Sequence, residues 1–135
     1  PGKYDNDDFP GYDNVKLSYS DLERVIARKD WIAALGNQKA VYLITDKKTG
    51  KLYVGSATGE EMLLQRWSQY AADGHGGNKK LEELVKDEGI GYVENNFQYS
   101  ILENYNGRID DKIVLRRESW WKEVLQSRQH GYNAN

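Results

Sequence analysis

The spacing of apolar residues changes once in the first part of the chain, and the change separates two kinds of element. Ser20 and Glu23 have the spacing of a capping box, and the apolar residues that follow, up to Leu35, recur with a helical period. This pattern predicts a helix. The runs 40–45 and 51–55 are instead short, apolar and β-branched, with a polar turn between them. They predict a β-hairpin.

The rest of the chain predicts three more helices and one more strand. Residues 60–72 and 110–127 carry apolar positions with helical spacing, and Asn78 is placed to cap another helix after a glycine-rich break. Residues 97–103 alternate loosely between apolar and polar side chains, which is typical of a strand. We therefore expect an α+β fold in which helices flank a small three-stranded antiparallel sheet.

The first residues have a different composition from the rest. Residues 1–17 mix glycine, proline, aspartate and asparagine without a period, so we expect an N-terminal arm or linker there and a single domain over residues 18–135. The chain begins with Pro1 and its one methionine is Met62, which suggests a fragment of a longer protein. Since no apolar run has the roughly 18 residues of a membrane helix and no targeting segment is recognisable, we expect a cytoplasmic protein without membrane contact.

Composition excludes several kinds of chemistry. The chain has no cysteine and two histidines, so disulfides, thiolate catalysis and cysteine-based zinc sites are excluded. Its 19 basic and 21 acidic residues give a net charge of −2, which is not the basic balance of a stand-alone nucleic-acid binder. Such a charge fits a module that a targeting domain or a partner protein positions on its substrate.

Two tyrosines of the predicted hairpin fall on the same face of the sheet. If residues 47–50 form the turn, Ile44 pairs with Tyr53, and Tyr42 lies two residues from Ile44 on the same side. Tyr42 and Tyr53 are then diagonal neighbours, roughly 7–8 Å apart. Tyrosines also favour strands for packing alone, so a structural role and a chemical role both remain open.

Further residues that could carry chemistry lie on the predicted helices. Arg66 and Tyr70 are four residues apart on one helix, and an arginine fork with a phenol suits a phosphate. Glu118 lies among apolar residues of the last long helix, where a carboxylate is costly unless it is paired or binds a metal. Lys122, four residues later, offers the alternative of an ordinary ion pair. His75, in the glycine-rich break, could bind a phosphate or move a proton.

Taken together, these positions resemble the GIY-YIG nuclease family. The matching residues, in chain order, are Ala40-Val41-Tyr42, Tyr53-Val54-Gly55, Arg66, Tyr70, Glu118 and Tyr132-Asn133. The chain departs from the family pattern in three respects: Ala40 replaces a glycine, both halves of the motif carry valine for isoleucine, and Ser56-Ala57 stands where some members carry a lysine.

The resemblance implies an endonuclease domain that hydrolyses phosphodiester bonds with one metal ion. Glu118 would hold the ion, Mg²⁺ or Mn²⁺, and the partner would be a nucleic acid, with DNA expected rather than RNA. Tyr42 would take a proton from the attacking water, and Tyr53 would orient either group. Two other functions remain alternatives: a non-catalytic nucleic-acid-binding module of the same fold, and a protein-interaction domain whose tyrosines only pack.

The same resemblance implies supporting roles for the other matched residues. Arg66 and Tyr70 would stabilise charge on the phosphoryl oxygens. A phenol with a pKa near 10 is almost entirely protonated at neutral pH, so the tyrosine that acts as base needs help, which Arg66, His75 or the metal could give. Asn133 would hold the surroundings of Glu118 or a backbone turn.

Overall fold

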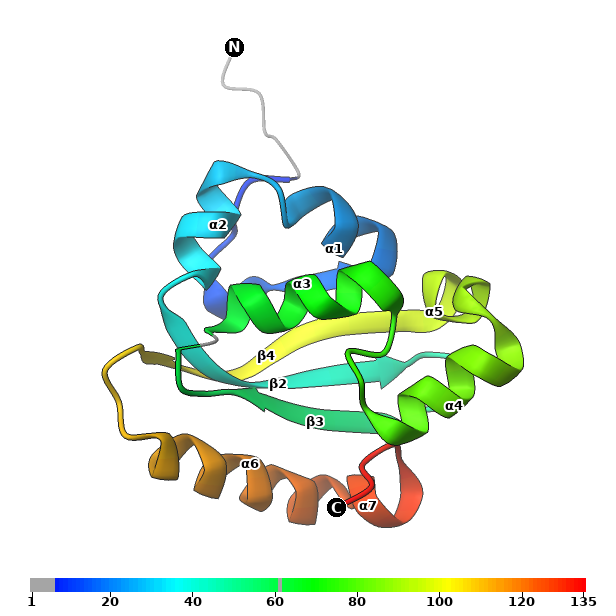
Figure 1. Cartoon of the computed structure of the whole chain (residues 1–135). Helices are drawn as coiled ribbons and strands as arrows, with labels where there is room; N and C mark the ends of the chain where they lie inside the picture. The colour runs from blue at the N-terminus through cyan, green and yellow to red at the C-terminus, as the bar shows by residue number, and fades with distance from the viewer. Residues whose placement is uncertain (1–6, 61) are drawn as a thin grey trace.

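The computed structural model of the protein describes residues 7–60 and 62–135. These residues form one antiparallel sheet of four strands in the order β1-β4-β2-β3, with helices on both faces (Figure 1). The strands are β1 Lys16–Ser18, β2 Gln38–Asp46, β3 Leu52–Ala57 and β4 Phe97–Asn106. The α+β class is confirmed, and the sheet has one strand more than the three that the sequence predicted.

The helices are divided unequally between the two faces. In Figure 1, α1, α2 and α3 lie over one face of the sheet, α6 lies under the opposite face, and α4 and α5 lie at one end. Their bounds are η1 (a 3-10 helix) Tyr12–Asn14, α1 Tyr19–Val25, α2 Lys29–Leu35, α3 Leu63–Asp73, α4 Lys79–Glu88, α5 Ile90–Asn96, α6 Asp111–Leu125 and α7 Ser127–His130. None of the helices within the described ranges has the length and apolar character needed to cross a bilayer.

β2 lies between β4 and β3 and separates two cores. Its register with β3 pairs Ile44 with Tyr53, as the hairpin pattern predicted, and Tyr42 with Gly55. Tyr42 and Ile44 belong to the larger core, which α1 to α5 cover, whereas Val41 belongs to a smaller core against α6. The alternation of a strand thus directs Tyr42 toward α3.

The beginning of the chain is more regular than its composition suggested. Val15 and Leu17 are buried, and β1 pairs with the edge of β4. The expected boundary between the arm 1–17 and the domain 18–135 falls inside this strand, because pairing covers the edge of β4 and buries two apolar side chains. The first six residues of the arm lie outside the described residues.

The first helix begins earlier than the sequence predicted. Ser18, not Ser20, is the N-cap: its hydroxyl accepts a hydrogen bond from the Asp21 backbone at 3.1 Å, and the Asp21 carboxylate accepts one from the Ser18 backbone at 3.2 Å. The single helix that we expected up to Leu35 is divided into α1 and α2. α5 was not predicted, since its seven residues are too few for a clear period.

Aromatic packing attaches the segment before β1 to α2. The ring of Phe9 contacts those of Tyr12 and Trp31, with centroids 5.0 Å apart in each pair. Phe9→Ala should lower the free energy of unfolding by about 2 kcal/mol, less than for a fully buried phenylalanine. Chemical denaturation, with the exposed Asp13→Ala as control, measures the difference. Equal stability of Phe9→Ala and the wild-type protein would show that this segment does not pack on the domain.

Candidate active site

Four side chains from β2, β3, α3 and the start of α4 are joined by hydrogen bonds. The hydroxyl oxygens of Tyr42 and Tyr70 are 2.7 Å apart. Asn78 donates from Nδ2 to the Tyr70 hydroxyl at 2.6 Å and accepts at Oδ1 from the Tyr53 hydroxyl at 2.7 Å. We call these four residues the phenol–amide network. It connects the two strands of the hairpin through side chains on α3 and before α4.

The guanidinium of Arg66 lies beside this network. Its Nη2 is 3.4 Å from both the Tyr70 hydroxyl and Asn78 Oδ1. Its Nη1 donates to the Gly76 carbonyl at 3.0 Å and to the Gln69 side chain. All of these acceptors are neutral. A partly buried cation whose acceptors are neutral keeps its charge available for an anion such as a phosphate group.

Burial determines the protonation state of the three phenols. Tyr42 and Tyr70 are fully buried, and Tyr53 is partly exposed. Burial raises the pKa of all three hydroxyl groups above their usual value, and the Glu118 carboxylate raises the pKa of Tyr42 and Tyr53 further. The Arg66 cation acts in the opposite direction on each of them. The phenols are therefore uncharged at neutral pH in the free protein.

Glu118 is held on α6, which lies against the smaller core. Its side chain is 16% exposed, and its Oε2 is 3.6 Å from Lys122 Nζ, so the ion pair suggested by the helical spacing is present. Val114 and Trp121 pack in the smaller core, but Leu115 is 46% exposed, so the apolar residues around Glu118 are only partly buried. In the part of the chain that the structure describes, no three His, Asp or Glu side chains gather as a potential metal site.

Two further predicted residues, His75 and Asn133, make their side-chain hydrogen bonds with backbone groups. Nδ1 of His75 accepts a hydrogen bond from the Gly77 backbone at 2.8 Å, which directs the ring toward its own loop. The side chain of Asn133 pairs with both backbone groups of Val54: Oδ1 accepts from the amide at 2.9 Å, and Nδ2 donates to the carbonyl at 2.8 Å. Asn133 thereby extends the hydrogen bonding of the sheet at the outer edge of β3, next to Tyr53.

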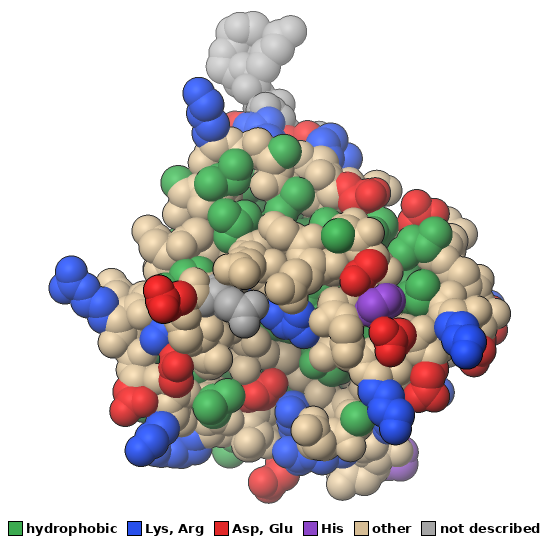
Figure 2. All heavy atoms as spheres, viewed as in Figure 1, with side chains coloured by type: hydrophobic (Ala, Val, Ile, Leu, Met, Phe, Trp, Pro, Cys, Tyr) green, Lys and Arg blue, Asp and Glu red, His purple; other side chains and the backbone are tan. Residues whose placement is uncertain are grey.

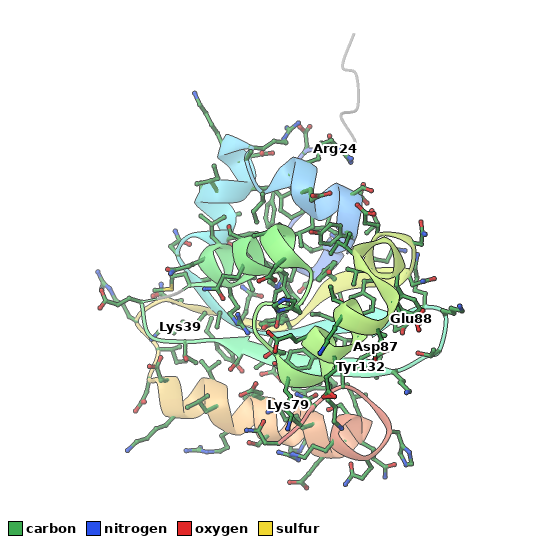
Figure 3. All side chains as sticks on the ribbon, turned by 45° about the vertical axis from the view of Figure 1, so that its right-hand side comes forward. Arg24, Lys39, Lys79, Asp87, Glu88 and Tyr132 are labelled. Carbon is green, nitrogen blue, oxygen red and sulfur yellow. The ribbon has the colours of Figure 1, made fainter. Side chains whose placement is uncertain are left out.

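A cavity of about 270 Å³ lies where the network meets the surface. Tyr53, Asn78, Lys79 and Tyr132 line it together with the last residues of the chain. Figure 3 shows Lys79 and Tyr132 near each other where α4 begins. A small ligand group in this cavity would contact the Tyr53 end of the network, whereas the Tyr42 end is covered by protein.

Comparison with known proteins identifies the family of the domain. The family model described as the GIY-YIG catalytic domain matches residues 38–133, which is most of the chain. The chain belongs to the GIY-YIG family. It is therefore a nuclease domain, as the sequence resemblance implied, and the assignment favours this activity over a protein-interaction domain.

Two solved structures of GIY-YIG domains are similar to this one. The catalytic domain of the homing endonuclease I-TevI is 28% identical with a TM-score of 0.55, over 72% of this chain and 98% of that chain. A mutant of the catalytic domain of the intron endonuclease I-TevI is 29% identical with a TM-score of 0.55, over 73% of this chain and 94% of that chain. No curated protein sequence matches the chain.

The structure explains the glycine that ends the second half of the GIY-YIG motif. Tyr42 and Gly55 are cross-strand partners. A Cβ atom on Gly55 would lie 2.4 Å from both Cζ and the hydroxyl oxygen of Tyr42. This distance is far shorter than a van der Waals contact, so the phenol lies directly on the Gly55 backbone. The tyrosine of the first half of the motif thus requires the glycine of the second half.

The sequence did not indicate the roles of two residues: Asn78 in the network, and Asp46, which contacts the cavity-lining Tyr132. Asn78 was expected to cap α4, but its side chain makes no cap hydrogen bond and joins the network instead. Asp46, at the end of β2, is fully buried, and its carboxylate accepts from the Tyr92 and Tyr132 hydroxyls at 2.7 and 2.6 Å. Burial alone would raise the pKa of Asp46, but these hydrogen bonds lower it below its usual value. The sequence feature that could have pointed to Asp46 was its position between an apolar strand and a polar turn.

Gly55→Ala should displace Tyr42, which costs about 1–3 kcal/mol of stability and most of the nuclease activity, because the phenol cannot keep its place over an added methyl group. Gly91→Ala on α5 is the matched control, since its Cβ would meet nothing within 4 Å and should leave stability equal or slightly higher. Thermal melting measures the stability of both variants, and cleavage assays measure their nuclease activity. A Gly55→Ala protein with the wild-type melting temperature would contradict the close contact.

Proposed function

We propose that the domain is a metal-dependent endonuclease that hydrolyses phosphodiester bonds of DNA with one metal ion. The observation that carries the proposal is the environment of Arg66, a partly buried cation with neutral acceptors, next to the Tyr70 phenol and the Asn78 amide of the network. Glu118 is close enough for its charge to affect Tyr42 and Tyr53. The similar catalytic domains belong to a homing endonuclease, which favours DNA over RNA as the substrate.

A single carboxylate, that of Glu118, suits a hard cation that keeps most of its water. Glu118 is the carboxylate whose charge reaches the phenols of Tyr42 and Tyr53, and Mg²⁺ commonly binds proteins through one or two carboxylates plus substrate phosphates. A bound Mg²⁺ or Mn²⁺ ion would polarise the scissile phosphate and stabilise negative charge on the leaving 3′ oxygen. Since Lys122 Nζ lies 3.6 Å from the Glu118 carboxylate, the lysine would have to give up this ion pair.

In this proposal Tyr42 first loses its own hydroxyl proton to solvent, and the phenolate oxygen then takes the proton of the attacking water. Burial raises the pKa of Tyr42, while the Arg66 cation and the hydrogen bond from Tyr70 lower it and so favour the phenolate that the reaction needs. Tyr42 has no exposed surface, so water reaches it only after a neighbour moves. The neighbour that moves in this proposal is Arg66, which leaves the Gly76 carbonyl and the adjoining Tyr70 hydroxyl for a substrate phosphate.

The remaining matched residues have supporting roles in the proposal. Arg66 stabilises negative charge on the phosphoryl oxygens, and Tyr53, which lines the cavity, orients the phosphate or the water. Tyr70 is fully buried, so we assign it to the support of the base rather than to phosphate contact. Asn133 fixes β3 beside Tyr53, and His75 is a phosphate contact only if its loop rearranges.

The surface around the site does not supply a general attraction for nucleic acid. On the face shown in Figure 2, basic and acidic side chains are interspersed and form no continuous basic area. The net charge of the chain is −2. Because non-specific nucleic-acid affinity depends on the number of phosphates that Lys and Arg neutralise, we expect weak binding by this domain alone. An attached domain or a partner protein would then supply the affinity.

Glu118→Gln should lower the rate of plasmid cleavage in Mg²⁺ on the order of a hundredfold or more, because an amide attracts a hard cation poorly. The fold should persist, since a neutral side chain is less costly to bury than an ion, and DNA affinity without metal should be equal or stronger. Glu123→Gln, at an exposed position of α6, is the matched control.

Single-turnover cleavage, melting temperature and DNA binding are measured on the same preparations, with EDTA as a further control. Cleavage by the Glu118→Gln protein at the rate of the Glu123→Gln protein would exclude Glu118 as the metal ligand. Cleavage by the wild-type domain at an undiminished rate in EDTA would exclude the metal itself.

A further inference from the structure

Asn78 occupies a position where an asparagine side chain usually caps a helix. It is the N-cap residue of α4, and such a side chain normally accepts a hydrogen bond from a backbone N–H in the first turn. No cap hydrogen bond of this kind is present. The amide is directed instead to the Tyr53 hydroxyl, the Tyr70 hydroxyl and the guanidinium of Arg66. α4 therefore lacks the stabilisation of a side-chain cap, and the Asn78 amide forms its hydrogen bonds with residues of the site instead.

The orientation of the Asn78 amide follows from its partners. A guanidinium can only donate, so the Asn78 atom that lies 3.4 Å from Arg66 Nη2 must be the carbonyl oxygen Oδ1. Nδ2 then faces the Tyr70 hydroxyl at 2.6 Å and donates to it, while the Tyr53 hydroxyl donates to Oδ1 at 2.7 Å. Reversal of the amide would place its NH₂ group against the guanidinium.

This orientation fixes the direction of the hydrogen bond between the two buried phenols. The oxygen of Tyr70 has two lone pairs, and it faces two donors, Nδ2 of Asn78 at 2.6 Å and, more weakly, Nη2 of Arg66 at 3.4 Å. The hydrogen of Tyr70 is therefore directed at its remaining neighbour, the oxygen of Tyr42 at 2.7 Å. Tyr42 accepts this bond, and its own hydroxyl hydrogen is not donated to any other residue of the network.

We propose that Asn78 is a positioning residue that keeps Tyr42 as the acceptor at the end of this series of hydrogen bonds. The inference rests on the proposed function, in which one proton passes from the attacking water to the phenolate oxygen of Tyr42. A hydrogen bond donated to that oxygen stabilises the phenolate, whereas a bond donated by Tyr42 would stabilise the neutral phenol. Asn78 acts through Tyr70 and not on the water.

Asn78→Asp tests the direction of these bonds, because it keeps the shape of the side chain and replaces its donor by an acceptor. Tyr70 should then donate to the new carboxylate, and Tyr42 should donate to Tyr70. We expect kcat for cleavage of saturating DNA with Mg²⁺ to fall at least about tenfold, the equivalent of one pKa unit in the base. Asn95→Asp, the same change at an exposed position of α5, should keep the wild-type kcat.

A double-mutant cycle with Tyr70→Phe separates this role from a loss of stability. Tyr70→Phe removes the group through which Asn78 acts on Tyr42, so the addition of Asn78→Asp to it should lower kcat by a smaller factor than in the wild-type background. Asn78→Ala removes both ends of the amide without adding charge. If the aspartate variant does not fold, kcat is measured for Asn78→Ala in the same double-mutant cycle, with and without Tyr70→Phe.

Two results would overturn the role of Asn78: an equal loss of kcat in the wild-type and Tyr70→Phe backgrounds, or a loss that appears only in KM. The failure of the proposed function has a different signature, because the wild-type domain itself would then not cut DNA in Mg²⁺ or Mn²⁺.

Discussion

The position of the Tyr42 ring on the backbone of Gly55 determines how the rest of the site is arranged. With no side chain at Gly55, the phenol can lie against the backbone of β3 while α3 packs on its other side. The rings of Trp67 and Tyr70 then pack on it edge to face, with centroids 6.1 and 5.8 Å away. This packing holds the Tyr42 ring, so the direction of its hydroxyl hydrogen bond is the freedom that remains. Asn78, acting through Tyr70, sets the direction of that hydrogen bond.

The electrostatics of the site favour uncharged phenols until a substrate arrives. Burial and the charge of Glu118 both raise the pKa of Tyr42, and the cation of Arg66 opposes them. A cation bound at Glu118 would neutralise the charge that disfavours the phenolate. Metal binding on α6 and proton transfer on β2 would therefore be coupled through space, although the two groups belong to different faces of the sheet.

The sequence predicted the parts of the fold and site that depend on local pattern. The hairpin register followed from its turn, which placed Tyr42 and Tyr53 on one face, and helical spacing placed Arg66 beside Tyr70. β1 escaped prediction because three residues in a polar segment show no period, and their strand state depends on the distant edge of β4. The role of Asn78 could not be predicted either, because its local pattern indicated a helix cap, whereas its side chain binds Tyr53, Arg66 and Tyr70, which only the folded chain brings to it.

The most direct test of the account compares two buried tyrosines, of which one has a hydroxyl that is hydrogen-bonded to another described residue and the other does not. Tyr42 and Tyr99 are both fully buried and both contact Trp67, but the Tyr99 hydroxyl has no hydrogen-bond partner in the described part of the chain. Single-turnover DNA cleavage in Mg²⁺ is measured for Tyr42→Phe and Tyr99→Phe, with melting temperatures to establish folding. The account predicts a loss on the order of a hundredfold or more for Tyr42→Phe, and wild-type cleavage with equal or higher stability for Tyr99→Phe. A folded Tyr42→Phe protein that cuts DNA as fast as the Tyr99→Phe protein would contradict it.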